Sequence, residues 1–579
     1  MNGSFVAPTV DWVYLVPILV VLGAGVVGVL VEAFVPARAR RTTQVVLALG
    51  ATAASCAAVV WLWGDPALAG DGGGAAGVRV LGGSLVVDHF GLAVQGTVAV
   101  LAFLALLVIA DRTSTGQDAF APTAAAVPGS PYEDLARRKG LEQTEVYPLV
   151  LFAVGGMMIF PSTGNLLVLF VALEVLSLPL YVLSAMARRR RLLSQEASFK
   201  YFLLGAFASA LLIFGVALIY GYAGSVDLAR IQQVIATGET PVADMTGLVL
   251  VGLLLVLAGL LFKVGAAPFH AWTPDVYQGA PTPVTGFMAA CTKAAAFGAL
   301  LRVLYSVSIG LVYGAPDVRE HLFVALWVVA LLTMVVGTAV GAVQTDVKRL
   351  LAYSSIAHAG FILVGVVGFN QLALRATVFY LLVYGLATVG AFAVVTLVRE
   401  KAPARVPALV GAAASTTTDA QTPDNPSDAG PDDGAVLGEA THLAQWAGLG
   451  RRSPWLAGTF ALFLLSMAGI PLTAGFIAKF SAFGAAIAGP DVQGGGSTWV
   501  LAVVGVLASA VAVFFYVRII VLMFFTPSAD PQDGPAVTVV RSTGPTTVAI
   551  AVCALGVLVL GVFPSPVLDL AAQAVKFVP

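Results

Sequence analysis

The sequence predicts an all-α membrane protein that crosses the bilayer about fourteen times. Hydrophobic types make up 59% of the 579 residues and charged types only 11%. The mean hydropathy is +0.94. A soluble domain carries about 25% charged residues, so an ordinary soluble enzyme is excluded. The 30 basic and 31 acidic residues nearly cancel, which argues against a nucleic-acid partner.

Fourteen apolar runs are long enough for a helix that crosses about 30 Å of hydrocarbon, which needs roughly 20 residues. They lie near residues 11–34, 43–63, 85–110, 146–162, 164–187, 196–223, 245–270, 283–308, 320–341, 350–370, 372–399, 455–486, 497–525 and 545–563. No Lys or Arg precedes the first run, so we expect no signal peptide.

The basic residues predict the orientation. Loops after odd-numbered helices carry about nineteen Lys and Arg, including Arg188 to Arg191, whereas the other loops and the two tails carry about five. The positive-inside rule therefore places both termini outside and the odd-numbered loops in the cytoplasm of a bacterial cell (inner) membrane.

Two loops are long and poor in large apolar residues. Residues 111–145 are rich in Ala, Pro and Thr, and residues 401–452 are rich in Ser, Thr, Pro and Asp. We expect both to be largely flexible cytoplasmic insertions, with linkers of no further function as the simplest interpretation.

Four charged residues lie inside apolar runs, namely Glu174, Lys263, Lys293 and Lys479. Each costs about 2.5–3.5 kcal/mol near the centre of a bilayer, and such residues commonly mark ion pathways. Loss of water favours a neutral lysine and an approaching carboxylate favours a charged one, so these groups suit proton transfer. A static ion pair between Glu174 and one lysine is the structural alternative.

Two of the lysine-bearing helices carry a proline in mid-span. Pro268 follows Lys263 in the seventh predicted helix, and Pro471 precedes Lys479 in the twelfth. Broken helices in matching places of two halves point to an ion pathway, although a single proline can be an ordinary kink. Helices 4–8 and 9–13 then form two five-helix repeats, and the odd number of spans inverts the second repeat.

The predicted organisation has five parts: an N-terminal three-helix segment, a cytoplasmic loop, two repeats and a C-terminal segment with helix 14. They span residues 1–110, 111–145, 146–310, 319–526 (with the insertion 401–452) and 527–579.

Further polar residues are secondary candidates. His358 lies well inside the tenth helix, four residues after Ser354, and either packs as a hydrogen-bonding residue or relays protons. His270 lies at the predicted break of helix 7. Glu196 and Lys200 are spaced for a local salt bridge. Lys348 is expected on a solvated interface.

The three cysteines, Cys56, Cys291 and Cys553, stand alone in apolar runs. No cysteine or histidine cluster could bind zinc or an iron–sulfur centre, so the chain is expected to have no cofactor or redox centre of its own.

The segment 262–283, FKVGAAPFHAWTPDVYQGAPTP, resembles the signature of the antiporter-like membrane subunits of bacterial NADH–quinone oxidoreductase, respiratory complex I. Within that family, Asp275-Val-Tyr277 is similar to the N-type members, whereas the L and M types usually carry Asp-Ala-His. Further matches are LEVLSLPLY at 173–181, EASFKY at 196–201 and DVKRLLAYSSIAH at 346–358.

This resemblance implies a proton-translocating subunit. Glu174 would modulate Lys263, Lys293 would lead into a central polar axis that includes His358, and Lys479 would be the exit-side lysine. FMN, iron–sulfur clusters and quinone would lie on partner subunits, among which are L- and M-type paralogues and small hydrophobic subunits. The alternatives are a subunit of a multi-subunit Na⁺/H⁺ antiporter and a non-translocating scaffold.

Overall fold

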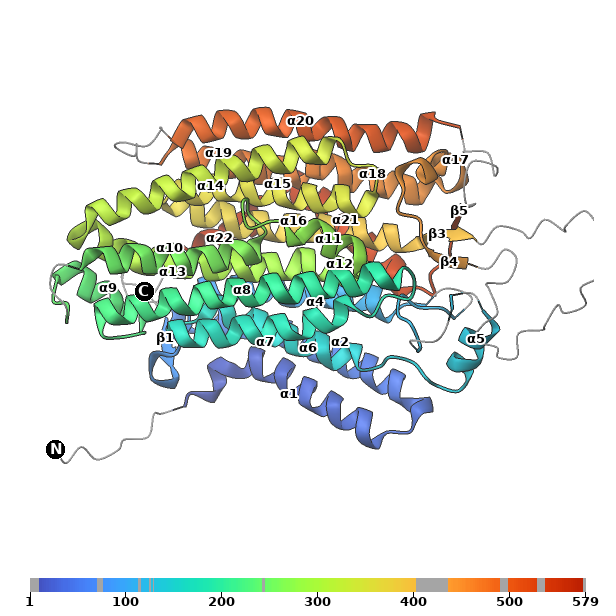
Figure 1. Ribbon diagram of the computed structural model, residues 1–579, viewed down its shortest axis with the longest axis horizontal. Coiled ribbons are helices and arrows are strands. Elements are labelled where there is room, and N and C mark those ends of the chain that lie inside the picture. Colours follow the sequence, from blue (N-terminus) through green and yellow to red (C-terminus); the bar gives the residue numbers. More distant parts are fainter. Residues whose placement is uncertain are drawn as a thin grey trace, which may run out of the picture.

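The computed structural model describes residues 10–575 except 70–76, 113–115, 124–126, 129, 242–244, 402–435, 490–497 and 528–536. Long helices run side by side along the length of the molecule (Figure 1). Within the described residues, twelve helices are long and apolar enough to cross a membrane. The prediction of an all-α polytopic membrane protein is confirmed.

Each of the fourteen predicted spans coincides with a helix or with two or more consecutive helices. The single-helix spans are α1 (Trp12–Phe34), α2 (Ala37–Trp63), α4 (His89–Ala110), α6 (Val146–Ile159), α7 (Leu166–Ser184), α8 (Arg191–Ala223), α14 (Pro316–Ala342), α15 (Val347–Val367), α16 (Gln371–Leu397), α20 (Thr498–Phe525) and α21 (Pro545–Val562). The predicted span 245–270 contains α10 (Thr246–Val264) and the break after it, and α11 (Trp272–Gly279) follows beyond its predicted end. Two further spans are composite, α12 (Thr282–Phe287) with α13 (Lys293–Gly314), and α18 (Pro454–Ala468) with α19 (Ala474–Ile487).

Short elements connect these spans. The short helices are α3 (Pro66–Ala69), α5 (Pro131–Arg138), α9 (Leu228–Thr237), α17 (Leu449–Arg452) and α22 (Ser565–Gln573). The strands are β1 (Val78–Val80), β2 (Leu85–Val87), β3 (Val398–Lys401), β4 (Val436–Glu439) and β5 (Val537–Val539). β1 and β2 pair with each other, and β3 pairs with both β4 and β5, all antiparallel.

The seventh and twelfth spans are broken as predicted, and the two breaks begin in the same way. Gly265 and Gly469 follow α10 and α18 with φ of 79° and 86°, a left-handed conformation that glycine adopts without strain. The next N–H groups close the same turn, Ala266 to Leu261 O at 3.0 Å and Ile470 to Leu465 O at 3.1 Å.

The two broken helices run in opposite directions. In Figure 1 the chain passes from α10 on the left towards α11, and from α18 on the right towards α19. This antiparallel arrangement, together with the shared capping of the two breaks, is what two inverted repeats require.

The most enclosed long helices are α15 and α16, each with 94% of its most apolar window buried. By contrast, the corresponding windows of α8 and α20 are only 33% and 39% buried. Exposed apolar side chains on these outer helices suit contact with lipid or with another subunit. The interior helices α15 and α16 therefore provide the enclosed site that a polar axis needs.

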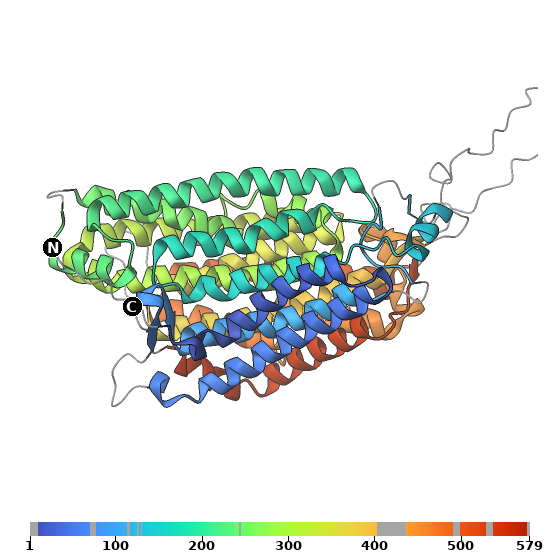
Figure 2. The ribbon, with the colours of Figure 1, turned by 90° about the horizontal axis from the view of Figure 1, so that it is seen from below.

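The described ends of the chain lie at one end of the bundle, whereas α5 and the β3–β4–β5 sheet lie at the opposite end (Figures 1 and 2). We call the latter the sheet end. The loops after the third, eleventh and thirteenth spans, all odd-numbered, gather there. These three odd-numbered loops therefore lie on the same side of the bundle, as the distribution of Lys and Arg predicts.

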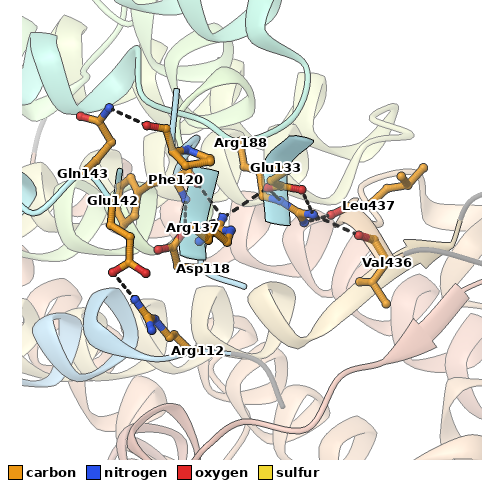
Figure 3. A network of polar contacts seen from close by, with 11 residues as sticks. Arg112, Asp118, Phe120, Glu133, Arg137, Glu142, Gln143, Arg188, Val436 and Leu437 are labelled. Carbon is orange, nitrogen blue, oxygen red and sulfur yellow. Dashed lines mark hydrogen bonds and ion pairs between the residues drawn. The ribbon is translucent and has the colours of Figure 1, made fainter. Parts of the chain in front are cut away.

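The described parts of the two long loops pack against the bundle, so the expectation that they are largely flexible is wrong for these parts. Arg188 donates from Nε to Glu133 of α5 at 2.5 Å and also binds the Val436 and Leu437 carbonyls of β4 (Figure 3). Trp446, in the second loop, is fully buried. Charge-assisted hydrogen bonds and one large buried aromatic residue thus hold these parts of the loops in place, although the loops contain few large apolar residues. The core of the second insertion, 402–435, lies outside the described residues.

Candidate functional site

The five primary candidates come from five different spans: Glu174 from α7, Lys263 from α10, Lys293 from α13, His358 from α15 and Lys479 from α19. The three lysines and His358 are buried, at 3–5% exposure, and Glu174 is half-buried. Their burial confirms that these charges do not reach the surface by extending along their helices.

Lys263 is held by hydroxyl groups. Its Nζ donates to Ser177 Oγ at 2.7 Å and to Tyr201 Oη at 3.2 Å, and lies 5.0 Å from the centre of the Tyr201 ring. Ser177 stands three residues after Glu174 on α7, hence on the same helix face. A hydroxyl from the helix that carries Glu174 thus binds Lys263.

Glu174 forms no ion pair with Lys263 within 4.0 Å in this structure. Its Oε1 accepts a hydrogen bond from Ser209 Oγ of α8 at 2.5 Å. Its negative charge nevertheless acts on Lys263 through space. The predicted Glu–Lys contact is therefore open in this conformation, with the two groups near each other.

Lys293 begins α13 directly after a π-helical turn at Met288–Thr292. Its Nζ donates to the Ser355 carbonyl of α15 at 2.6 Å and lies 5.5 Å from the centre of the Tyr384 ring. Single π turns inside α-helices frequently occur at functional sites because they change the direction of the next side chains. Lys293 thereby connects the first repeat to the helix that carries His358.

Lys479 turns back towards the break in its own span. Its Nζ donates to the carbonyl of Ala468, the last residue of α18, at 2.9 Å and to Ser509 Oγ of α20 at 2.5 Å. The C-terminal end of a helix attracts a positive charge. A Cβ on Gly469 would lie 3.0 Å from Lys479 Cδ, so glycine keeps this space open for the lysine.

His358 binds a tyrosine hydroxyl with each ring nitrogen. Nδ1 lies 2.8 Å from Tyr380 Oη of α16, and Nε2 lies 3.3 Å from Tyr516 Oη of α20. His358 therefore joins α15 to α16 and α20 through its two ring nitrogens.

We call the five primary candidates, Glu174, Lys263, Lys293, His358 and Lys479, the polar row. Pro268 and Pro471 are exposed on the outside of the bundle and do not line it. Two backbone N–H groups at the breaks bind hydroxyl groups, since the Ala267 N–H donates to Thr333 Oγ1 at 2.9 Å and the Gly475 N–H to Ser466 Oγ at 3.2 Å. Pro268 and Pro471 lie within the breaks, after α10 and α18 have ended.

The secondary candidates lie apart from the row. Lys200 forms the predicted salt bridge with Glu196, at 2.6 Å, and a second one with Asp275 at 2.7 Å. Arg349 also binds Asp275, at 2.7 Å. These partly exposed groups join α8, α11 and α15.

His270 is half-buried in the break of the seventh span, and within the described residues its Nδ1 has no hydrogen-bond partner. Lys348 is buried, with its Nζ donating to the Ala280 carbonyl at 2.6 Å, so its predicted solvated position is wrong. The carbonyl of Ala280 accepts the hydrogen bond from Lys348 that water was expected to accept.

Sequence reasoning missed one fully buried ion pair. Arg302 of α13 donates to both carboxylate oxygens of Asp88, at 2.6 and 2.7 Å, and its Nε donates to the Pro161 carbonyl at 2.8 Å. The signal was present, since a single Arg and a single Asp of opposite charge stand near the ends of two apolar runs. The hydroxyl partners Ser177, Tyr201 and Tyr516 were also missed, because apolar helices commonly contain such residues.

Comparisons with known proteins agree with one another. The family described as "NADH:quinone oxidoreductase/Mrp antiporter, TM" matches residues 163–412 and 434–511. A protein of Beutenbergia cavernae, "NADH-quinone oxidoreductase subunit N", is 60% identical over 579 residues, which covers 99% of this chain and 100% of that protein.

Two solved structures have the same fold. A chain of respiratory complex I from Thermus thermophilus with bound aureothin gives a TM-score of 0.68 at 30% identity, over 96% of this chain and 99% of that one. A chain of the Mrp complex from Dietzia sp. DQ12-45-1b gives a TM-score of 0.68 at 21% identity, over 96% and 97%. The second likeness shows the fold alone.

Proposed function

The chain belongs to the NADH-quinone oxidoreductase subunit N family, the antiporter-like proton-pumping membrane subunits of complex I, and we propose that its protons pass along Glu174, Lys263, Lys293, His358 and Lys479. It is thus a multi-pass membrane subunit of a multi-subunit NADH-quinone oxidoreductase. The proposal concerns which side chains move the protons and how they do so.

One observation carries the proposal: the three lysines of the row are bound by neutral groups. Their partners are the Ser177 and Tyr201 hydroxyls, the Ser355 carbonyl, and the Ala468 carbonyl with the Ser509 hydroxyl. Among the described residues none of them has a carboxylate within 4.0 Å.

A neutral partner lets a lysine change its charge. Hydroxyl and carbonyl oxygens accept hydrogen bonds from an ammonium and from a neutral amine alike, so losing a proton leaves no unpaired buried charge. Arg302 shows the contrast, since this fully buried arginine is paired with both oxygens of Asp88. Its positive charge has a carboxylate partner, and the charges of the three lysines do not.

Glu174 supplies the control. An approach of its carboxylate would stabilise the charged form of Lys263, and its withdrawal would favour proton release towards Lys293. Moving one charge takes about 2.3 kcal/mol for each 100 mV of membrane potential, which a single Glu–Lys contact in a poorly hydrated site is able to supply.

In this proposal the chain is a translocase without a redox centre, and it has no cofactor of its own. NADH oxidation and quinone reduction take place on partner subunits that hold FMN and iron–sulfur clusters. The neighbours in the membrane are L- and M-type paralogues and small hydrophobic subunits. The first repeat spans 146–310 and the second 319–526, flanked by segments 1–110 and 527–579.

The proposed orientation places the sheet end in the cytoplasm of a bacterial cell and both termini outside, because the basic residues of the odd-numbered loops gather at the sheet end. Protons would enter beside Glu174 and Lys263 and leave beside Lys479.

The test is to isolate the tagged chain in mild detergent, identify the co-purifying subunits and reconstitute the preparation in vesicles. We expect flavin and iron–sulfur partners, quinone-dependent NADH oxidation and proton uptake that does not require Na⁺. Small antiporter partners, with Na⁺-dependent proton exchange and no NADH oxidation, would instead establish the Na⁺/H⁺ antiporter alternative.

A further inference from the structure

The imidazole of His358 is held between two tyrosine hydroxyls that come from different helices. Tyr380 of α16 lies at Nδ1, 2.8 Å away, and Tyr516 of α20 lies at Nε2, 3.3 Å away. The histidine and both tyrosines are at most 3% exposed. Neither tyrosine is among the residues assigned to the proton route above.

The chain of hydrogen bonds continues beyond Tyr516. Its hydroxyl also forms a hydrogen bond with the hydroxyl of Ser354, a buried residue. Ser354 stands four residues before His358 on α15, so one helix contributes two members to the chain. Tyr380, His358, Tyr516 and Ser354 thus form a continuous hydrogen-bonded series.

Hydroxyl partners on both sides have a particular chemical consequence. A backbone carbonyl or a carboxylate at one nitrogen would fix which nitrogen carries the proton. A tyrosine hydroxyl is both a donor and an acceptor, so it can face a protonated or an unprotonated nitrogen by rotating its O–H bond. His358 can therefore take either tautomer, or become doubly protonated, with both nitrogens still bound.

The position of the series suits transfer between the two repeats. Lys293 of the first repeat binds the carbonyl of Ser355, the residue next to Ser354. Tyr516 shares α20 with Ser509, which binds Lys479.

We propose that Tyr380 and Tyr516 relay protons to and from His358, with Ser354 as the next group in the series. This inference rests on the function proposed above and adds three residues to the proton route. It gives α20 a direct part in transfer, because that helix supplies Tyr516, which binds His358, and Ser509, which binds Lys479.

The step balances as a concerted shift of single protons. A proton released by the Lys293 ammonium reaches Tyr380 Oη through water, and the hydroxyl proton of Tyr380 moves to Nδ1. The Nε2 proton moves to Tyr516 Oη, whose own proton passes to Ser354 Oγ. Ser354 releases one proton towards Lys479, so one proton enters, one leaves, and no group is oxidised or reduced. Rotation of the hydroxyls, together with reorientation of the imidazole ring, restores the starting arrangement.

The experiment replaces each relay tyrosine in the intact complex and measures NADH-driven proton pumping in sealed inside-out vesicles. Tyr516→Phe and Tyr380→Phe keep the aromatic ring and remove the hydroxyl. Tyr305→Phe is the matched control, because Tyr305 donates to the Asn370 carbonyl at 3.1 Å and lies outside the series. We expect pumping to slow by roughly tenfold in both relay variants and to be unchanged in the control.

A second readout separates relay from packing. Pumping is compared in H₂O and D₂O, and we expect a larger isotope effect in the relay variants because proton transfer at His358 has become slower than the other steps. An unchanged isotope effect in slow variants would indicate a packing role and overturn the proposal. Ser354→Ala, which keeps both rings, replaces any tyrosine variant that does not assemble, and normal pumping in it would also overturn the proposal.

His358→Gln distinguishes the relay from the wider function. If it slows pumping while both tyrosine variants pump normally, the relay is wrong and the proposed route through His358 stands. If all three variants pump normally, both the relay and the place of His358 in the route are wrong.

Discussion

Glu174 and Lys263 form no ion pair within 4.0 Å, and they bind different hydroxyls. Glu174 accepts from Ser209 at 2.5 Å, and Lys263 donates to Ser177 at 2.7 Å. The carboxylate and the ammonium therefore have alternative partners when they separate. A pair that opens without leaving either group unbonded can act as a switch, because neither state carries the full cost of an isolated buried charge.

Glu174→Gln is expected to slow coupled NADH oxidation and proton pumping by roughly tenfold, since the amide keeps a hydrogen bond to Ser209 but cannot attract Lys263 as a carboxylate does. Pumping and the amount of assembled complex are measured together. Glu320→Gln, on the half-buried start of α14, is the control. Normal pumping in assembled Glu174→Gln complex would exclude the switch.

Ser509→Ala is expected to slow pumping by roughly tenfold, because Lys479 then keeps only the Ala468 carbonyl as a hydrogen-bond partner and loses a group able to donate to its neutral amine. Thr338→Ala is the control. Its buried hydroxyl binds only carbonyls of its own helix, Met334 and Val335. Equal pumping rates in the two variants would contradict a role for Ser509.

Arg302→Met should lower the stability of the folded chain by about 3–5 kcal/mol, because it leaves the buried Asp88 carboxylate without the positive charge of Arg302. Arg375→Met is the matched control, since its partner Asp569 is 72% exposed at 3.6 Å. The thermal stability of the two purified variants is compared with that of the unmodified protein. The Arg302–Asp88 pair has no structural role of this size if both variants unfold at the same temperature.

Asp111→Asn tests the link between α4 and the start of α21. Burial alone would raise the pKa of Asp111, but hydrogen bonds from Ser542, Thr543 and Thr546 outweigh it and hold the pKa below its usual value. The carboxylate therefore stabilises the fold above about pH 4, and this contribution is lost as the pH falls through the folded-state pKa. At pH 7 the variant should be less stable by about 1.5–3 kcal/mol.

The pH dependence is measured by thermal unfolding of the detergent-purified chain at several pH values. The difference between Asp111→Asn and the unmodified chain should be largest above about pH 4 and shrink as the pH is lowered further, through the folded-state pKa. A difference that stays constant below about pH 4 would show that the charge of Asp111 contributes nothing.

The sequence alone could predict the spans, the two breaks and the burial of the row of charges, because each depends on local properties. Apolar length gives the spans, a proline in mid-span gives the breaks, and a lysine well inside a long apolar run is expected to be buried. The structure differs in one respect, since Lys263 lies in the last turn of α10 and Lys293 begins α13. The sequence shows a glycine, Gly265 or Gly469, shortly before the proline of each break. The structure adds that both glycines cap the preceding helix in the same way.

The partners of these charges could not be predicted, since they depend on how each helix is rotated and displaced against its neighbours. Tyr516 lies more than 150 residues from His358 in the chain, and nothing in its local sequence distinguishes it from a packed tyrosine. The same holds for Arg302 and Asp88. The packed parts of the long loops were missed because Arg188 binds them through polar contacts, which composition does not reveal.

The most direct test of the central claim is NADH-driven proton pumping by assembled Lys263→Met complex in sealed inside-out vesicles. Lys139→Met is the control, because Lys139 is exposed at the end of α5, outside the bundle. We predict that pumping falls by roughly tenfold or more in Lys263→Met and is unchanged in Lys139→Met. Pumping at the control rate in fully assembled Lys263→Met complex would show that the buried lysines are structural and would contradict the proton route.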